Sequence, residues 1–69
     1  MDRHAVESSM SLSIGYEPIT MTLEIEFRSG EVWQYYDVPE HAYYEMIGTS
    51  IGKYFQENIK NQYIEKRVA

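Results

Sequence analysis

The sequence predicts a small α+β domain, in which a three-stranded antiparallel meander packs against two short helices. Three observations predict this class. Apolar and polar residues alternate between residues 9 and 28, which is the period of half-buried strands. From residue 37 onward, the apolar residues recur at the spacing of one helix face. The chain has only 69 residues, so we expect residues 1–69 to form a single domain.

The alternation places the first two strands. In the first strand the apolar positions end with Tyr16, and Glu17-Pro18 breaks the pattern. The alternation returns from Met21 to Arg28, and this second strand is the clearest element of the sequence. The expected inward-facing residues are Met10, Leu12, Ile14 and Tyr16 in the first strand, and Met21, Leu23, Ile25 and Phe27 in the second.

A turn over residues 28–30 sets the register of the third strand. If these residues form a three-residue loop, with the glycine in the left-handed region, Ile25 faces Trp33 and Leu23 faces Tyr35. Trp33 and Tyr35 then lie on the apolar face of the sheet. A slip of one residue would turn the alternate residues of the third strand inward, so this assignment depends on the turn.

Two helices are predicted after the strands. Asp37 and Glu40 have the spacing of a capping box at a helix start, and Gly48 is placed to end that helix. Thr49 or Ser50 then caps a second helix. The expected core-facing residues are Tyr43, Met46 and Ile47 in the first helix, and Ile51, Tyr54, Phe55 and Ile59 in the second. Both helices are too short to persist alone, so packing onto the sheet must hold them.

The two ends of the chain have weaker patterns. Residues 1–7 are expected to be loosely ordered. Near the C-terminus, Tyr63, Ile64 and Val68 either add a fourth strand to the sheet or lie across the core. The sequence leaves both arrangements open.

The amino-acid composition limits where the protein is expected to act and how it is stabilised. There are no cysteines, which fits a reducing cytoplasm, and no apolar stretch approaches the roughly 20 residues that span a bilayer. We therefore expect a cytoplasmic protein without a membrane partner. Since no disulfide can staple a fold this small, assembly into a homodimer or small homo-oligomer is one way to stabilise it.

Charge is distributed unevenly along the chain. The net charge of −5 argues against a strong electrostatic grip on nucleic acid, which depends on Lys and Arg contacts to phosphates. Residues 1–50 carry nine acidic and two basic side chains, a net −7, whereas residues 51–69 carry two acidic and four basic ones, a net +2. An anion would therefore dock on the C-terminal third, although a solvated helix face and tail would carry the same lysines.

Several short motifs occur in a fixed order along the chain. They are Ile14-Gly15-Tyr16-Glu17, Trp33-Gln34-Tyr35 and Val38-Pro39, followed by Ser50, Gly52, Tyr54-Phe55, Ile59 and Tyr63. In their order and spacing they resemble the KTSC domain, a family named after the C-terminus of some lysyl-tRNA synthetases. The resemblance extends from about Val6 to Val68. The sequence departs from the family pattern at Trp33, where the family has tyrosine, and at Glu17, where it has aspartate.

The resemblance implies a binding module without an established activity. Such domains occur alone in small bacterial and phage proteins, and beside a synthetase they have been supposed to contact RNA. Trp33 keeps an aromatic surface but lacks the phenolic hydroxyl of the family's tyrosine, so a role that needs this hydroxyl would be lost.

Two kinds of residue are candidates for a ligand site. The start of the second helix offers backbone amides with Ser50 and Lys53 nearby, which could hold a phosphate, although an ordinary capped helix would have the same residues. Exposed tyrosines offer surfaces on which bases stack. The candidate ligand-binding residues are Ser50, Lys53, Lys60, Tyr36, Tyr63, Lys66 and Arg67. The aromatic residues expected in the core instead are Trp33, Tyr35, Tyr54 and Phe55.

The sequence predicts neither catalysis nor a metal site nor a cofactor. His41 and Glu45 are four residues apart, but two ligands do not make a metal site. No serine has the sequence surroundings of a catalytic nucleophile. Glu24 and Glu26 are expected on the outward face of a strand, where charges face water. We therefore expect a protein that is not an enzyme.

Two function classes, and a combination of them, follow from these observations. A module that binds RNA or nucleotides predicts that Lys53, Lys60, Lys66 and Arg67 converge on one surface with exposed tyrosines. A protein-protein interaction or self-assembly module predicts a dimer or larger species, because a free strand edge and surplus aromatics favour association. In the combined form, a small oligomer would sequester a nucleotide signal between its subunits.

Overall fold

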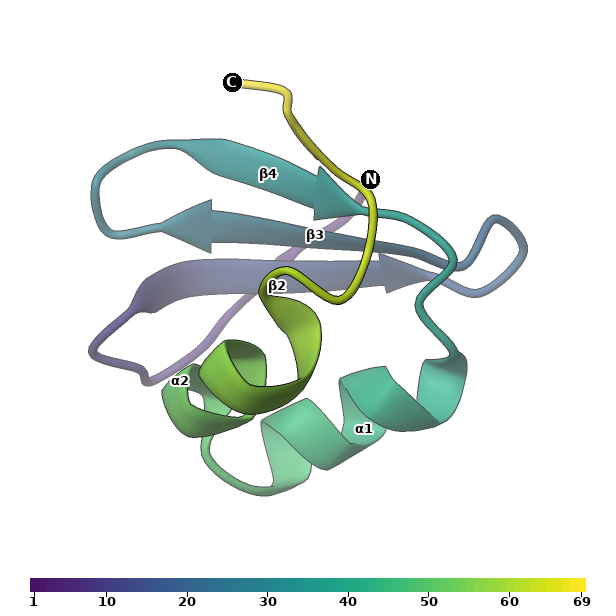
Figure 1. Cartoon of the computed structure of the whole chain (residues 1–69). Helices are drawn as coiled ribbons and strands as arrows, with labels where there is room; N and C mark the ends of the chain where they lie inside the picture. The colour runs from purple at the N-terminus through teal and green to yellow at the C-terminus, as the bar shows by residue number, and fades with distance from the viewer.

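The computed structural model, which describes residues 1–69, has a five-stranded antiparallel sheet. The strands lie in chain order and are β1 (His4–Ala5), β2 (Ser11–Glu17), β3 (Thr22–Phe27), β4 (Val32–Tyr35) and β5 (Glu65–Arg67). The helices are α1 (Glu40–Gly48) and α2 (Ile51–Tyr54), and α2 continues into a π-helical turn, η1 (Phe55–Ile59). Figure 1 shows the helices together on one face of the sheet. The α+β class predicted from the sequence is confirmed, and the predicted three-stranded meander gains one strand at each edge.

Both added strands come from the ends of the chain. β5 forms beside β4, which is one of the two arrangements that the sequence left open for the C-terminal tail. At the other edge, β1 lies within the residues that we expected to be loosely ordered, and it pairs only His4 with Ile14 and Ala5 with Ser13. A strand of two residues is too short to produce an alternating pattern, so it could not be predicted from the sequence.

The turn between β3 and β4 confirms the register predicted from the sequence. Ile25 pairs with Trp33, and Leu23 pairs with Tyr35. The N–H of Phe27 donates to the carbonyl oxygen of Glu31 at 2.9 Å, which closes the three-residue loop. Its glycine has a φ of 96°, a left-handed value that a side chain would oppose. Local turn chemistry therefore decides which face of β4 packs on the helices.

A bulge in β2 corrects the predicted alternation of the first strand. Ser11 pairs with Phe27, and Ser13 pairs with Glu26, the residue before Phe27, so Leu12 has no partner of its own. Leu12 is 38% exposed, whereas Ser11 is fully buried. The prediction that Leu12 faces inward with Ile14 is wrong, because the extra residue of the bulge reverses the alternation at this point.

The hydrophobic core lies between the sheet and the helices. Its fully buried apolar residues are Ile14, Leu23, Ile25, Val38, Met46 and Ile59. Phe55 joins the two layers, because its ring meets Phe27 and Tyr35 edge to face, at centroid distances of 5.6 Å and 5.4 Å. Of the four aromatics expected in the core, Tyr35 and Phe55 are buried, while Trp33 and Tyr54 are half-buried at its border.

The starts of the two helices differ from each other. Asp37 has a φ of 58° and does not cap α1, which begins after Pro39 without a side-chain cap. The predicted capping box is therefore wrong. The neighbouring Val38 is fully buried, and its N–H donates to the carbonyl oxygen of Met21 at 3.0 Å, so tertiary contacts fix the backbone at this helix entry. The predicted cap of the second helix is confirmed, because the Oγ of Ser50 accepts from a backbone N–H of α2.

The face of the sheet turned away from the helices, here called the outer face, is only partly open to water. Glu24 lies at its centre and is only 6% exposed. The expectation that Glu24 simply faces solvent is wrong, because the N-terminal arm, residues 1–5, lies over this part of the sheet. Its neighbour Glu26 is half-buried on the same face.

Candidate functional site

The largest hollow of the surface is a groove between the N-terminal segment and the α1–α2 junction, here called the α1–α2 groove. It has a volume of about 840 Å³. Its polar lining residues are His4, Glu7, Ser8, Ser9, Thr49, Ser50, Lys53 and Gln56. Its apolar lining residues are Val6, Met10, Ile47 and Ile51. Several hydroxyls, one amide, one imidazole, one carboxylate and one ammonium group thus surround a partly apolar surface, an arrangement that suits a polar ligand with an apolar part.

Ser50 and Lys53 reach this groove because α1 ends just before it and α2 begins inside it. The Oγ of Ser50 accepts from the Lys53 N–H at 3.4 Å, which sets the first turn of α2. The Lys53 side chain is exposed, and it also borders a second hollow of about 230 Å³ beside Tyr54 and Glu57. The ammonium group can therefore serve either hollow.

The other five candidate residues lie outside the α1–α2 groove. Tyr36 and Lys66 flank Gln34: the Tyr36 hydroxyl donates to Gln34 Oε1 at 2.9 Å, and Lys66 pairs with Gln34 across the β4–β5 ladder. Arg67 is 3.8 Å from a carboxylate oxygen of Glu31. Lys60 is exposed after η1, and Tyr63 is half-buried against the core.

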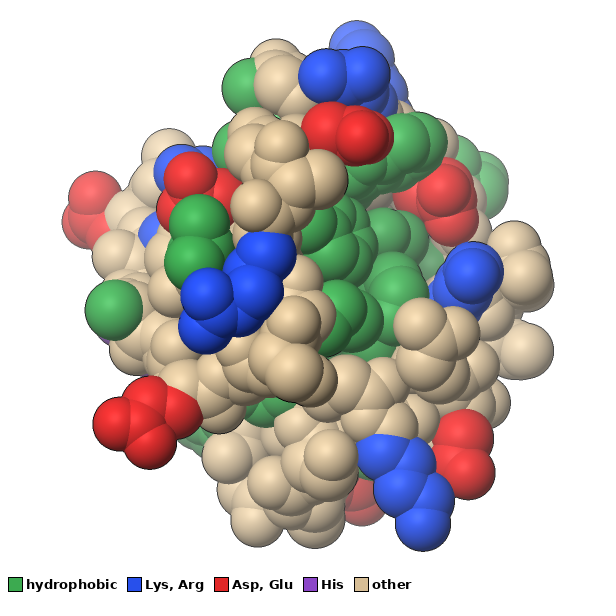
Figure 2. Space-filling model, turned by 90° about the vertical axis from the view of Figure 1, so that its left-hand side faces the viewer, with side chains coloured by type: hydrophobic (Ala, Val, Ile, Leu, Met, Phe, Trp, Pro, Cys, Tyr) green, Lys and Arg blue, Asp and Glu red, His purple; other side chains and the backbone are tan.

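The basic residues do not form one continuous surface. Lys53 lies by the segment that leads into β2, whereas Lys66 and Arg67 lie on β5, at the opposite edge of the sheet from β1. In Figure 2, Lys and Arg side chains form separate patches, several with Asp or Glu beside them, around a hydrophobic area. The prediction that Lys53 converges with Lys60, Lys66 and Arg67 on one surface is therefore wrong, because α2 and the C-terminal tail pack at different places on the sheet. Of the candidate residues, the structure brings only Ser50 and Lys53 together in the groove.

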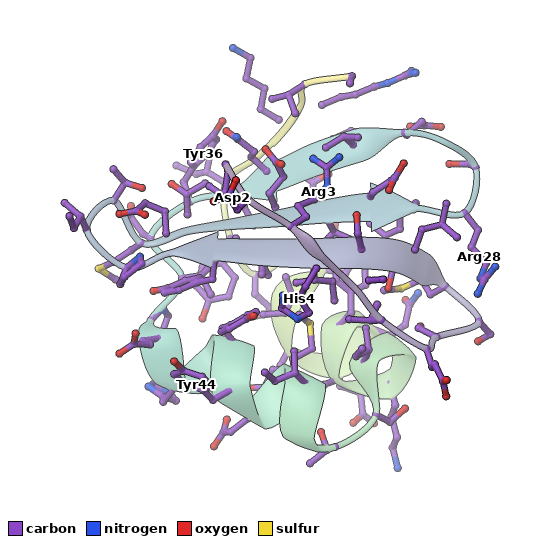
Figure 3. All side chains as sticks on the ribbon, turned by 180° about the vertical axis from the view of Figure 1, so that it is seen from behind. Asp2, Arg3, His4, Arg28, Tyr36 and Tyr44 are labelled. Atoms are coloured by element: carbon purple, nitrogen blue, oxygen red, sulfur yellow. The ribbon has the colours of Figure 1, made fainter.

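A second polar cluster, around Glu24 on the outer face, was missed by the sequence analysis. The carboxylate of Glu24 accepts from Gln34 Nε2 at 2.8 Å and forms an ion pair with Arg3. The Arg3 Nε also donates to the Oγ of Ser13 at 2.9 Å, and this hydroxyl donates to Glu26 at 2.9 Å. Figure 3 shows the arm crossing this face of the sheet, with Asp2 and Arg3 over the strands. Two side chains, Arg3 and Gln34, thus meet at one buried carboxylate, and Arg3 links it through Ser13 to Glu26.

The cluster perturbs the acidity of Glu24. Burial alone would raise the pKa of Glu24, but hydrogen bonds from Gln34 and Arg3, with the charge of Arg3, outweigh burial and lower it below the usual carboxyl value. Glu24 is therefore ionised in the folded protein at neutral pH. The sequence does contain a signal for this cluster, because an acidic residue in the middle of a central strand favours a nearby cationic side chain. The alternation pattern does not show which residue supplies that cation.

An aromatic cluster adjoins the α1–α2 groove at His4. The His4 ring meets Tyr43 edge to face at 6.3 Å, and Tyr43 stacks on Tyr16 at 5.2 Å. Tyr44, which is 58% exposed, contacts Tyr43 at 5.3 Å. Tyr44 is thus the tyrosine most open to a ligand on this side of the molecule.

Residues 7–63 match the family model of the KTSC domain. This chain belongs to the KTSC family. The resemblance seen in the sequence motifs is thereby confirmed over most of the chain.

Known proteins similar to this KTSC domain include one solved structure and two sequences. The crystal structure of a KTSC domain protein from Yersinia pestis superposes with a TM-score of 0.95, at 36% identity over 99% of this chain and 97% of that chain. An uncharacterized protein of Stutzerimonas stutzeri is 36% identical over 91% of this chain and 90% of its own length. A lysine–tRNA ligase of Nostoc sp. is 40% identical over 83% of this chain, which corresponds to 10% of the ligase.

Two further features bear on the kind of site. Neither helix of the KTSC domain has the length and apolar character needed to cross a membrane. No group of three or more His, Cys, Asp or Glu side chains is arranged to hold a metal ion.

Proposed function

We propose that this KTSC domain is a non-catalytic binding module, and that it binds a nucleotide, free or at the end of an RNA strand, in the α1–α2 groove. The observation that carries the proposal is the position of Ser50 and Lys53. The sequence singled out these two residues as a candidate phosphate site, and both line the largest groove of the molecule.

The chemistry of the groove supports a ligand with a phosphate. Lys53 supplies a positive charge, and the hydroxyls of Ser8, Ser9 and Ser50 can donate to phosphate oxygens. Met10 and Ile51 offer an apolar surface for a base or sugar. Ligand pockets usually have volumes of about 300–1,000 Å³, and the groove, at about 840 Å³, lies within that range.

The relatives and the charge distribution limit the ligand class further. One relative is named as a lysine–tRNA ligase, and a domain attached to such an enzyme would lie close to RNA. A long RNA strand, however, is held mainly by a row of Lys and Arg side chains along its phosphates. The net charge of −5 and the separation of Lys53 from Lys66 and Arg67 favour a ligand of one or two nucleotides instead.

An amide NMR titration of the full chain tests this proposal. The probes are a panel of linear and cyclic nucleotides and a short single-stranded RNA. We expect shifts confined to residues 4–10 and 47–56, and a loss of at least tenfold in affinity in the Lys53→Glu variant. Lys60→Glu is the matched control, because it makes the same change of charge at an exposed position outside the groove. Equal affinity in the two variants, or shifts centred on β5, would refute the groove as the site.

Protein interaction is the second candidate function, and the open edges of the sheet favour it. β1 and β5 each have one side without a neighbouring strand. Large apolar side chains are also exposed, among them Ile19 at 90% and Ile64 at 73%. If no nucleotide binds and light scattering gives a mass above one chain, this second function is the better account.

A further inference from the structure

The N-terminal arm, residues 1–5, is held on the sheet by few contacts. All five of its residues are exposed. Only two of them pair with β2, and the strongest single attachment is the ion pair between Arg3 and Glu24. The contact between His4 and Tyr43 is long, at 3.5 Å between the ring nitrogen and the hydroxyl. The arm therefore adheres through charge and backbone pairing rather than through buried apolar area.

The surface beneath the arm, in contrast, is built by the rest of the domain. Gln34 holds one oxygen of the Glu24 carboxylate, and the Tyr36 hydroxyl holds the Gln34 side chain in turn. Gly15 leaves room for the arm, since a Cβ there would lie 2.3 Å from the carbonyl oxygen of Asp2. None of the residues that make these contacts with Glu24 and Gln34 belongs to the arm. What the surface lacks without the arm is a cation beside the Glu24 carboxylate, which Gln34 holds at the centre of the outer face.

We infer that this surface is a receptor for the N-terminal arm, and that it accepts the arm of a second copy of the chain as well as its own. Two chains then exchange their arms and form a reciprocal dimer, in which Arg3 of each copy pairs with Glu24 of the other. Every contact between arm and sheet is kept in the exchange, so the dimer costs little beyond the entropy of association.

The segment that joins the arm to β2 permits this exchange. Residues 6–10 contain no helix or strand. They are held by few bonds, such as the Val6 N–H to the Leu12 carbonyl oxygen at 3.1 Å and the Arg28 Nε to the Ser8 carbonyl oxygen at 2.8 Å. His4 lines the α1–α2 groove, so in the exchanged dimer each groove is completed by His4 of the second copy. The exchange does not depend on what the groove binds.

A pair of charge-reversed variants tests the exchange. In Arg3→Glu and in Glu24→Lys, the two positions carry like charges within the chain and also within a dimer of identical chains. When the two variants are mixed, Arg3 of the Glu24→Lys chain can pair with Glu24 of the Arg3→Glu chain. At the other site of the same dimer, the glutamate introduced at position 3 pairs with the lysine introduced at position 24. We expect one-chain mass for each variant alone and two-chain mass for the equimolar mixture, by light scattering. If the mixture stays at one-chain mass, the exchange does not occur.

Single-cysteine variants decide the question if Glu24→Lys does not fold. The chain has no cysteine, and Ala5 faces Ser13 in the β1–β2 register. A mixture of Ala5→Cys and Ser13→Cys chains should form a mixed disulfide under mild oxidation if arms exchange. The control mixes Ala5→Cys with Asn58→Cys, an exposed position on η1. Because the chain's own arm competes at an effective concentration of about 1 mM, the chains are mixed near that concentration. Equal yields of the two mixed disulfides would overturn the inference.

Discussion

Replacement of Gly15 by alanine should detach the N-terminal arm while leaving the rest of the fold intact. A Cβ at this position would lie 2.3 Å from the carbonyl oxygen of Asp2 and 3.2 Å from the Cγ of Arg3. The obstacle at the closest point is backbone, so a side-chain rotation cannot relieve it. Gly15 does not have a positive φ, so alanine causes no backbone strain within β2 itself. The arm is the part that must move.

The size of the effect follows from the contacts that are lost. Detachment breaks the Arg3–Glu24 ion pair and the backbone pairing of β1. A hydrogen bond to a charged group contributes about 1.5–3 kcal/mol and a neutral one about 0.5–1.5 kcal/mol, and the freed arm regains part of its conformational entropy. We expect a loss of about 2–3 kcal/mol in the free energy of unfolding. For a domain of this size, that loss lowers Tm by roughly 8–24 °C.

Gly48→Ala is the matched control for this substitution. Gly48 is the last residue of α1, and a Cβ there has nothing within 4 Å. Alanine should therefore stabilise the domain, by up to about 0.5–1 kcal/mol. Urea and thermal unfolding, followed by the fluorescence of the single tryptophan, measure both variants, and hydrogen exchange of the Ala5 and Val6 amides reports on the arm. Wild-type stability and protected arm amides in Gly15→Ala would refute the reasoning.

Two further predictions concern ionisable groups. Because the folded-state pKa of Glu24 is lowered, its ionised form stabilises the domain above the ordinary carboxyl pKa, and this contribution is lost as the pH falls through the lower folded value. Glu24→Gln should therefore be less stable than the wild type at pH 7, and its stability should fall less on acidification. Urea unfolding at a series of pH values measures this, and curves of unfolding free energy against pH that run parallel for the two proteins would contradict it. A hydrogen bond to Glu45, aided by burial, raises the pKa of Tyr54 to about 12. Glu45→Gln should bring the pKa of Tyr54 back toward the usual value of about 10, as followed by NMR of its ring carbons, and an unchanged titration would show that the bond does not form in solution.

The central hairpin could be predicted from the sequence because its determinants are local. The alternation of β3 marks Leu23 and Ile25 as core residues, and the loop over residues 28–30 fixes the pairing of Ile25 with Trp33. The prediction that Met21 also faces inward is wrong, because Met21 precedes the strand with a φ of 55° and is 37% exposed. The cap at Ser50 was predictable from local determinants as well, since a capping side chain bonds to amides only a few residues away. These features can be predicted without knowing how the rest of the chain folds.

The mispredicted features each depend on a distant partner. Asp37 does not cap α1, because the burial of Val38 and its bond to Met21 fix the entry to the helix. Leu12 turns outward in a bulge that exists only as a pairing of β2 with β3. Glu24 looked like an ordinary solvent-facing charge, and only the return of the N-terminal arm over the sheet makes it buried.

The candidate site divides in the same way. Ser50 and Lys53 are three residues apart on one helical turn, so the sequence alone placed them together. Whether Lys60, Lys66 and Arg67 join them depends on how the helices and the tail pack, and the structure sets the latter two on β5 at the far edge of the sheet. The sequence by itself thus determined the central meander and the cap of α2, because short-range periodicity and turn chemistry encode them. It also indicated the family, through the order and spacing of its motifs. The tertiary structure alone decided the α1–α2 groove and the Arg3–Glu24 contact, because both join segments about 20 or more residues apart whose meeting depends on packing.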